Sequence, residues 1–481
     1  MPGQAFAGMK VVIMGLGLHG GGLESALYLA KQGAALTVTD LRDEKTLAPS
    51  IEKLEAGNKY RIRYVLGRHE EADFRNADMV VKNPGVRPDS PYLRLARRVE
   101  TDISLFLADN PARLVAVTGS KGKSQSASAL CRVLGEAREK GLLPGRAFLG
   151  GNIAASPLGF LDRLRPEDDV VLELSSWQLG DLRGRALLKP RAALITSIMR
   201  DHQDRYGSME SYVADKRLVY RCQDGASVTA ARDDAWGRSF LAETPGRPLL
   251  CAGRPLAEAV AGAWISGPGE AGYARPYENT GGASAVSRRI LKVVPEKVLV
   301  PGYHQKKNLL GAAAVLLDLG LDSEFIASGL GSFPGVEHRL EFFREREGAR
   351  YYNDSAATIP EAAAAAIDSF GCRVVLVTGG TDKDLDFSPL AEAAYRARDR
   401  LAAVVLLAGS GSEKLRPLLE AAGLACLGPF DGADAAARAA AEQALPGSAV
   451  VLSPGCASFG MFLNEFDRGK KWKEAVISLG P

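Results

Sequence analysis

The chain has few cysteines and no long apolar run. Its 481 residues include six cysteines, scattered along the chain without a C-x-x-C pair. Such sparse thiols exclude a disulfide framework or a zinc ribbon and indicate a reducing, cytoplasmic location. No stretch of 18 or more apolar residues occurs, and the first eight residues lack the pattern of a signal peptide. We therefore expect neither a membrane span nor a membrane partner.

An excess of charge of either sign is also missing. The chain has 60 Lys and Arg against 57 Asp and Glu, which gives a net charge of +3. This balance argues against a basic nucleic-acid-binding surface or an acidic tail as the main feature, so we expect no nucleic-acid partner. Hydrophobic residues make up 46% of the chain, and at about 150 residues per domain the length predicts about three globular domains.

Glycine, in contrast, is abundant. There are 52 glycines, where average usage would give about 34. Many follow short β-branched runs and precede helical patterns, as after Lys10–Met14, Leu114–Thr118, Val374–Thr378, Val404–Leu407 and Val450–Ser453. A strand, a glycine loop and a helix in this order predict an α/β fold with parallel sheets, in which ligands bind at the carboxyl ends of the strands.

The first glycine loop reads G-x-G-x-x-G from Gly15 to Gly20, directly after a predicted strand. Asp40 follows twenty residues later, at the end of the next predicted strand. Such glycines allow a backbone to approach a diphosphate, and the acidic residue accepts a hydrogen bond from a ribose or a base. The motif alone leaves three interpretations open: NAD, another diphosphate carrier, or a tight turn without a ligand.

The second glycine loop, Thr118–Ser124, is a shortened Walker A loop of the form G-x-x-G-K-S. Its backbone N–H groups would cradle phosphates, Lys123 would reach the β and γ oxygens, and the Ser124 hydroxyl suits Mg²⁺. A dehydrogenase has no need of this loop. A diphosphate loop followed by a triphosphate loop therefore indicates an ATP-driven reaction on a nucleotide-carried substrate.

Acidic and histidine residues follow two of the next strands. The strand at 169–174 delivers Glu173, and a carboxylate at a strand end beside a phosphate loop is a natural Mg²⁺ ligand. The strand at 191–198 runs into Asp201-His202, and His202 is one of only five histidines. Lys216, in a predicted helix over 212–220, would by itself be read as a surface lysine.

These motifs, taken in order, resemble the Mur ligase family, most closely its D-glutamate-adding type. The likeness covers nearly the whole chain. It extends through Gly15–Gly20, Asn83-Pro84-Gly85, Gly119–Ser124, Gly151-Asn152, Glu173–Ser176, Asp201-His202 with Asp204–Tyr206, Lys216, His304 with Asn308, His338-Arg339, Asn353–Ser355, Gly379-Gly380 with Lys383, and Ser453-Pro454 with Cys456–Ser458.

The resemblance implies three α/β domains and a monomer. These are a Rossmann-like UDP-binding domain at 1–107, a P-loop ATPase-like central domain at 108–333, and a Rossmann-like amino-acid-binding domain at 334–481. The implied reaction uses ATP and Mg²⁺ to join D-glutamate to UDP-N-acetylmuramoyl-L-alanine, a precursor of peptidoglycan, through an acyl phosphate. Lys216 matches the lysine that CO₂ carbamylates in this family, which would turn a cation into a carboxylate-like metal ligand.

The resemblance also assigns residues to each ligand. Contacts to the UDP-linked substrate would come from Gly17, Leu18, His19, Asp40, Arg42, Asn83, Gly85 and Asn152. Contacts to ATP would come from Gly119, Ser120, Lys121, Gly122, Lys123, Ser124, Asn308, Arg339 and Asp354. The incoming amino acid would meet Thr358, Lys383 and Ser458. Metal ligands would be Ser124, Glu173, His202 and Lys216, and the catalytic residues Lys123, Glu173, His202 and Lys216.

Five positions depart from the family pattern. Ala356 stands where the family usually has lysine, and Gln305, Arg200 and the pair Glu465-Phe466 also differ. The changes leave the ATP and metal residues in place but bear on amino-acid specificity. Three alternatives therefore remain. The first is a sister ligase with another amino acid, or a folylpolyglutamate-type ligase, which lacks the N-terminal diphosphate loop. The second is an NAD-dependent dehydrogenase, which would explain Gly15–Gly20 but leave Gly119–Ser124 and Lys216 without a role. The third is a non-catalytic nucleotide-binding relative.

Overall fold

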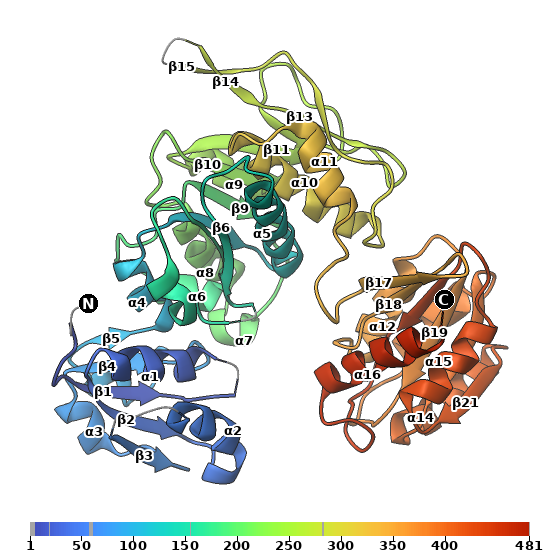
Figure 1. Cartoon of the computed structure of the whole chain (residues 1–481), viewed down its shortest axis with the longest axis horizontal. Helices are drawn as coiled ribbons and strands as arrows, with labels where there is room; N and C mark the ends of the chain where they lie inside the picture. The colour runs from blue at the N-terminus through green and yellow to red at the C-terminus, as the bar shows by residue number, and fades with distance from the viewer. Residues whose placement is uncertain (1–4, 19, 57–60, 154, 281–282, 481) are drawn as a thin grey trace. The chain divides into compact units, whose positions relative to one another are not determined.

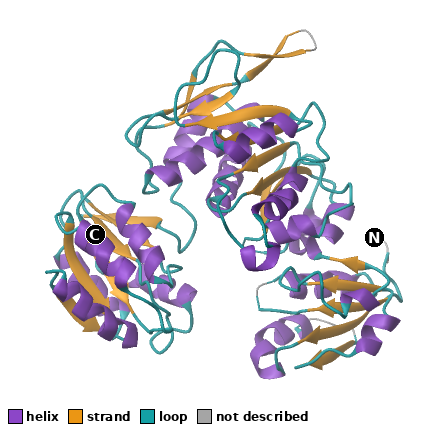
Figure 2. Ribbon diagram, turned by 180° about the vertical axis from the view of Figure 1, so that it is seen from behind, coloured by secondary structure: helices purple, strands orange, loops and turns teal. Residues whose placement is uncertain are grey.

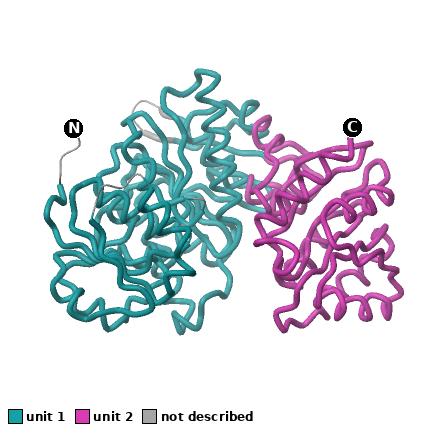
Figure 3. Tube along the Cα trace, turned by 60° about the horizontal axis from the view of Figure 1, so that its bottom comes forward, with its two compact units in different colours: residues 1–264, 273–293, 310–326 teal, residues 265–272, 294–309, 327–481 magenta. Residues whose placement is uncertain are grey.

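The computed structural model describes residues 5–18, 20–56, 61–153, 155–280 and 283–480. It divides into two compact units (Figure 3), the first made of residues 1–264, 273–293 and 310–326 and the second of residues 265–272, 294–309 and 327–481. Among the described residues, no helix is both long and apolar enough to cross a bilayer. Each unit is built on mainly parallel β-sheet with helices on its faces (Figure 2).

The first sheet has the strand order β3-β2-β1-β4-β5, and all its neighbouring pairs are parallel (Figure 1). Its strands are β1 (Lys10–Met14), β2 (Ala35–Asp40), β3 (Ile62–Leu66), β4 (Met79–Lys82) and β5 (Val99–Glu100); the helical segments are α1 (Gly21–Lys31), α2 (Glu44–Glu55), α3 (Glu71–Asn76), η1 (Leu93–Leu95) and α4 (Asp102–Asp109). Alternate side chains of β1 point to opposite faces of the sheet. Val11 and Ile13 join the core with α1, whereas Val12 and Met14 pack with Phe74 of α3. Both faces are thus covered, as a parallel sheet requires.

The central sheet, most of whose residues belong to the first unit, has nine strands in the order β16-β13-β12-β11-β10-β9-β6-β8-β7. They are β6 (Arg113–Thr118), β7 (Ala147–Gly151), β8 (Asp169–Glu173), β9 (Ala192–Ile195), β10 (Val228–Arg232), β11 (Arg247–Ala252), β12 (Gly262–Trp264), β13 (Gly272–Arg275) and β16 (Leu291–Val294). The helical segments are α5 (Lys123–Glu139), η2 (Pro157–Arg163), α6 (Ser176–Gly180), α7 (Gln203–Tyr206), α8 (Met209–Lys216), η3 (Arg217–Val219), α9 (Ala235–Glu243), α10 (Tyr303–Asp318) and α11 (Ser323–Gly331). Strands β6 to β12 pair in parallel, and β12 meets β13 antiparallel. Helix α5 buries Leu130, Val133 and Leu134 at helical spacing, which fixes the helix that follows the second glycine loop.

The second unit contains a six-stranded sheet in the order β17-β18-β22-β19-β20-β21, parallel except for the β17–β18 pair. Its strands are β17 (Glu341–Arg346), β18 (Ala349–Asn353), β19 (Val374–Gly379), β20 (Leu401–Leu407), β21 (Cys426–Phe430) and β22 (Ala449–Leu452); its helices are α12 (Pro360–Asp368), α13 (Ser388–Arg396), α14 (Ser410–Ala421), α15 (Ala433–Glu442) and α16 (Glu465–Ser478). Val374 and Leu376 pack on one face with α12 and α13, while Val375 and Val377 pack on the other with α15 and α16. This is again a doubly covered α/β layer.

The glycine-rich stretch at 226–300, which has no recognisable motif, contains strands. It holds β10 to β13, β16 and the antiparallel hairpin of β14 (Tyr277–Thr280) with β15 (Ala283–Val286). The α/β fold class predicted from the strand–glycine–helix pattern is confirmed. From the sequence, hairpins or an excursion are expected here, and the β14–β15 hairpin is present. The extension of the central sheet was not predicted, because its strands are short and lack the alternating apolar pattern.

Candidate functional site

A cavity of about 720 Å³ lies at the carboxyl ends of β1, β2 and β4. Five of the residues predicted for the UDP-linked substrate line it: Gly17, Asp40, Arg42, Asn83 and Gly85. Leu18 and Asn152 are not among its lining residues, and His19 lies outside the described residues. The cavity has the place and size expected for a nucleotide-linked ligand of an open parallel sheet.

Asp40 shapes this cavity through the backbone. Its buried carboxylate accepts hydrogen bonds from the Gly17 N–H at 3.1 Å and the Arg42 N–H at 3.0 Å. Gly17 has a φ of 66°, in the left-handed region that glycine adopts without strain. Asp40 therefore holds the first glycine loop against the end of β2.

His69 lines the same cavity and is absent from the sequence prediction. Its Nδ1 lies 2.7 Å from the Thr39 hydroxyl, its ring packs against Phe74 and Tyr92, and burial lowers its pKa. A neutral imidazole beside a predicted diphosphate pocket offers a hydrogen bond without a fixed charge. No motif marks this residue, because it follows β3 in a loop without a known pattern.

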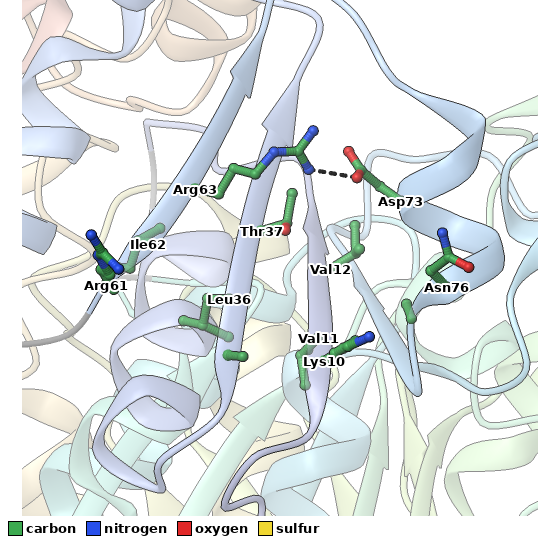
Figure 4. A pocket seen from close by; sticks show the side chains of 12 residues that line it. Lys10, Val11, Val12, Leu36, Thr37, Arg61, Ile62, Arg63, Asp73 and Asn76 are labelled. Atoms are coloured by element: carbon green, nitrogen blue, oxygen red, sulfur yellow. Dashed lines mark hydrogen bonds and ion pairs between the residues drawn. The ribbon is translucent and has the colours of Figure 1, made fainter.

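A second hollow, of about 400 Å³, lies at the opposite edge of the same sheet (Figure 4). The first residues of three strands, Lys10, Ala35 and Ile62, contribute to it, and an ion pair joins Arg63 to Asp73 at its rim. It contains none of the predicted site residues. Because ligands of such sheets bind at the carboxyl ends of the strands, the first cavity is the candidate site.

The second glycine loop connects β6 to α5 and has the form of a phosphate cradle. Helix α5 begins at Lys123, and its first turn carries no acidic residue. Gly119 has a φ of 141°, and a Cβ added there would lie 1.9 Å from the Thr196 hydroxyl. The Ser120 hydroxyl binds the Met199 N–H at 2.9 Å and lies 2.8 Å from the Tyr212 hydroxyl. The loop is thus fastened to the segment after β9, and it leads directly into the amino end of a long helix, whose positive dipole favours an anion.

Glu173, the last residue of β8, stands beside this loop. Strand β8 pairs with β6, with Val117 opposite Glu173, and the glutamate is only 1% exposed. Its Oε1 accepts a 3.1 Å hydrogen bond from Asn152 Nδ2, whereas Oε2 is buried without a partner. A buried carboxylate oxygen without a donor fits a cation, and oxygen ligands from Glu173 and Ser124 suit Mg²⁺. Asn152 thus contacts Glu173 and is not among the residues that line the cavity.

Lys216 is buried against the same loop. It is 1% exposed, and its Nζ donates to the Gly119 carbonyl at 2.8 Å. Burial and the neighbouring Lys123 ammonium lower its pKa to about 7, although Asp201, Asp215 and Glu173 act in the opposite sense. About half of this amine is therefore neutral near pH 7. A neutral, enclosed amine is a nucleophile, which a surface lysine is not.

His202 stands at the entrance of the short helix α7 in a left-handed conformation, with a φ of 51°. Its ring lies 5.1 Å from that of Trp177, and the Arg205 guanidinium lies 4.1 Å from the same indole. A non-glycine residue held in this region costs about 1–3 kcal/mol, and such residues cluster at functional sites. Trp177 was not singled out from the sequence.

In the second unit, Asp354 and Arg339 lie on one loop system. Asp354 accepts hydrogen bonds from the Leu340 N–H at 3.1 Å and the Ser453 hydroxyl at 2.7 Å, and burial raises its pKa to about 7. Arg339 is exposed between His338 and Leu340, which both have positive φ. Asn308, on α10, is buried.

Lys383 and Ser458 are brought together by two paired loops. Thr381 and Ala457 exchange backbone hydrogen bonds of 3.1 and 3.0 Å, and the Lys383 Nζ lies 5.5 Å from the Phe459 ring. Thr358 is half-buried just before α12. Phe466, in the first turn of α16, lies 5.6 Å from the His338 ring and is 46% exposed.

Arg468 connects these loops by hydrogen bonds, and it was not predicted from the sequence. It is 1% exposed and donates to the Ser355 hydroxyl at 3.0 Å, the Ser355 carbonyl at 2.8 Å and the Cys456 carbonyl at 3.1 Å. The sequence offers one indication of its role. Arg468 lies near the amino end of α16, where the helix dipole disfavours a basic side chain.

Family models match the chain in three segments that follow the three sheets. Residues 9–104 match the Mur ligase MurD-like N-terminal domain, residues 117–316 the Mur ligase middle domain, and residues 338–456 the Mur ligase glutamate ligase domain. The chain belongs to the Mur ligase family. The family and the three-domain α/β organisation inferred from the motif order are thus confirmed, and members of this family are ATP-dependent ligases that use Mg²⁺.

Curated relatives resemble this Mur ligase over nearly its whole length. The UDP-N-acetylmuramoylalanine–D-glutamate ligase of Treponema pallidum (strain Nichols) is 40% identical, covering 98% of this chain and 97% of that protein. That of Roseiflexus sp. (strain RS-1) is also 40% identical, over 98% and 99%, and that of Borreliella afzelii (strain PKo) is 37% identical, over 98% of each.

Solved structures support the fold of this Mur ligase. The UDP-N-acetylmuramate-alanine ligase of Thermotoga maritima superposes with a TM-score of 0.56 at 18% identity, covering 98% of this chain and 100% of that one. A UDP-N-acetylmuramoyl-L-alanyl-D-glutamate–2,6-diaminopimelate ligase superposes with a TM-score of 0.54 at 15% identity, over 100% and 96%. At these identities the likeness concerns the fold.

Proposed function

We propose that this Mur ligase joins the amino group of D-glutamate to the alanyl carboxylate of UDP-N-acetylmuramoyl-L-alanine, with cleavage of ATP to ADP and phosphate. Full-length relatives with this name support the substrate pair. The proposal depends mainly on one observation. The first unit contains a cavity at the carboxyl ends of β1, β2 and β4, and it also contains a P-loop with Glu173 and Lys216 beside it. We further propose domain limits of 1–107, 108–333 and 334–481. We also propose that the protein is a monomer and lies in the cytoplasm.

The chemistry begins with a poor electrophile. A carboxylate does not react with an amine, so the γ-phosphoryl group of ATP is first transferred to it, which forms an acyl phosphate. The amine then attacks the acyl carbon, and phosphate leaves from the tetrahedral intermediate. The P-loop N–H groups and the Lys123 ammonium would stabilise negative charge on the transferred group. Bound Mg²⁺ would offset further charge at Ser124, Glu173, His202 and Lys216.

Lys216 would contribute as a carbamate. Its neutral amine would attack CO₂, forming an N–C bond and releasing one proton, and the product is a carboxylate-like anion. The low pKa of about 7 supports this assignment, because only the unprotonated amine reacts. A carbamate would also remove the repulsion between two neighbouring ammonium groups, those of Lys123 and Lys216.

In the second unit, Arg339, Asp354 and Asn308 would contact ATP. Lys383, Thr358 and Ser458 would hold the amino acid, with the Lys383 ammonium facing a carboxylate. Ala356 removes a positive charge from this region, so the specificity for D-glutamate needs a direct test.

The test measures phosphate release with ATP, Mg²⁺ and UDP-N-acetylmuramoyl-L-alanine while the amino acid is varied among D-glutamate, L-glutamate, L-lysine and meso-diaminopimelate. We expect release with D-glutamate alone. Release with another amino acid instead would identify a sister ligase. Binding of ATP without release for any amino acid would identify a non-catalytic relative.

A further inference from the structure

A buried ion pair joins the first sheet to the central one. The Lys82 Nζ donates to Asp181 Oδ2 at 2.7 Å, and the two side chains are 3% and 8% exposed. The residues are 99 positions apart, one at the end of β4 and the other directly after α6. Burial of two charges costs desolvation free energy, and an apolar pair of similar size often stabilises a fold as much as a buried ion pair does. Stability alone therefore does not account for this pair.

On the first sheet, Lys82 borders the cavity proposed for the UDP-linked substrate. It directly precedes Asn83, and its Nζ also donates to the Val86 carbonyl at 3.3 Å. Asn83 and Val86 both line the cavity, and the Val86 N–H returns a 2.9 Å hydrogen bond to the Asn83 carbonyl. The ammonium thus sits beneath the turn that forms one wall of the cavity.

On the central sheet, Asp181 belongs to the group of residues around the P-loop. It closes α6, which starts three residues after Glu173, and Lys82, Arg205 and Asp215 are the charges that face it. Asp215 accepts from the Tyr206 hydroxyl at 3.1 Å and from Arg183, and it directly precedes Lys216. The acidic partner is therefore anchored among the segments that carry Glu173, His202 and Lys216.

We propose that Lys82 and Asp181 are positioning residues that set the register between the UDP-linked substrate and the P-loop, so that the alanyl carboxylate meets the γ-phosphoryl group. A diphosphate carrier fixed in the first cavity must present its far end to a centre built by another sheet. An enclosed pair of fixed length is suited to this task, because it resists sliding of one sheet along the other. The inference rests on the proposed function.

The test compares wild type with Asp181→Glu, which keeps the charge but lengthens the link, and with Lys82→Met/Asp181→Leu, which replaces the pair by apolar side chains. We expect kcat for phosphate release to fall about 10- to 100-fold, the cost of a misplacement near 1 Å. The dissociation constants of UDP-N-acetylmuramoyl-L-alanine and of ATP, measured separately by calorimetry, should stay close to the wild-type values.

A matched control is Arg247→Met/Asp318→Leu. This pair, at 3.1 Å with 22% and 11% exposed side chains, lies within the central sheet region and borders neither the cavity nor the P-loop. We expect its kcat to be unchanged.

Unchanged kcat in Asp181→Glu would overturn the proposal even if the double variant failed to fold. Weakened binding of the UDP-linked substrate at unchanged kcat would also overturn it, since that result assigns Lys82 to the cavity wall alone. An inactive wild type would contradict the proposed function itself, which separates the two failures.

Discussion

Several ionisable side chains in this Mur ligase are buried where their charge is expensive. Lys216 and Asp354 are 1% and 8% exposed, and burial moves the pKa of each to about 7, downwards for the amine and upwards for the carboxyl. Perturbed groups of this kind gather at functional sites because the chemistry needs a particular protonation state. Each therefore yields a test at the level of a single residue.

For Lys216→Ala, we expect phosphate release to fall about 100-fold or more, because the proposed carbamate would be lost and loss of a metal ligand costs at least as much as loss of its supporting contacts. Short carboxylic acids should partly restore the rate by supplying the missing carboxylate, and they should not stimulate wild type. At constant dissolved CO₂, wild-type activity should rise between pH 6 and pH 8 as the amine with a pKa of about 7 loses its proton. Full activity of Lys216→Ala would contradict the carbamate.

For Asp354→Asn, the prediction concerns stability against pH. The folded carboxyl has a pKa of about 7 against the usual 3.8, so between these values the folded chain keeps a proton that the unfolded chain has lost. The contribution of Asp354 is fully present below the lower value and declines by about 1.4 kcal/mol per pH unit up to the higher one. The Tm of Asp354→Asn minus the Tm of wild type should therefore increase as the pH rises from 5 to 7. The affinity of the variant for ATP should be lower than that of wild type.

Asp43→Asn is a suitable control for this experiment. Asp43 is an exposed helix cap, and its hydrogen bond to Thr46 lowers the pKa of its carboxyl. It stays ionised throughout that range, so the Tm difference of this variant should not change with pH. A constant difference for Asp354→Asn as well would contradict the assignment.

At the level of the element, the sequence predicted strands that end in glycine loops more reliably than the contacts between loops. β1 and β6 fall where their apolar runs indicate, because a strand followed by glycine is a local signal. Arg468 and the Lys82–Asp181 pair could not be predicted, since each bridges segments about 100 residues apart. His69 was also missed, as only the packing of its ring against Phe74 and Tyr92 places it in the cavity.

The P-loop provides a prediction about an element. In Gly119→Ala, the new Cβ would lie 1.9 Å from the Thr196 hydroxyl in a backbone conformation that alanine avoids. We expect a loss of about 1–3 kcal/mol in the free energy of unfolding, as for other overpacked sites. The increase in Tm that ATP and Mg²⁺ give to wild type should also disappear, as measured by thermal unfolding.

The control for this variant is Gly135→Ala, within α5, where a Cβ would meet nothing within 4 Å. This change should stabilise the chain by up to about 1 kcal/mol through helix propensity and keep the ATP effect. An intact ATP effect in Gly119→Ala would show that the loop tolerates a side chain, contrary to a phosphate cradle.

For the whole molecule, the proposed ligand residues are divided between two units. The cavity at β1 and the P-loop belong to the first, whereas Arg339, Asp354, Lys383 and Ser458 belong to the second. The proposed reaction combines three substrates, and enzymes commonly assemble such groups by closure of domains. We therefore expect the UDP-linked substrate to order the first unit, and the ligands added later to order the second.

Hydrogen exchange on the full chain tests this order. UDP-N-acetylmuramoyl-L-alanine alone should slow exchange at Gly17 and Gly85 in the first unit, and leave the loops around Lys383 and Ser458 unchanged. Addition of a non-hydrolysable ATP analogue and D-glutamate should then protect those loops, because ordering them requires ligands that bind there. The amide of Arg63, at the hollow on the opposite edge of the first sheet, is the internal control and should not respond. Protection at Arg63 in place of Gly17 would move the UDP-linked substrate to that hollow, and protection of the Lys383 loop by the first ligand alone would contradict the sequential order.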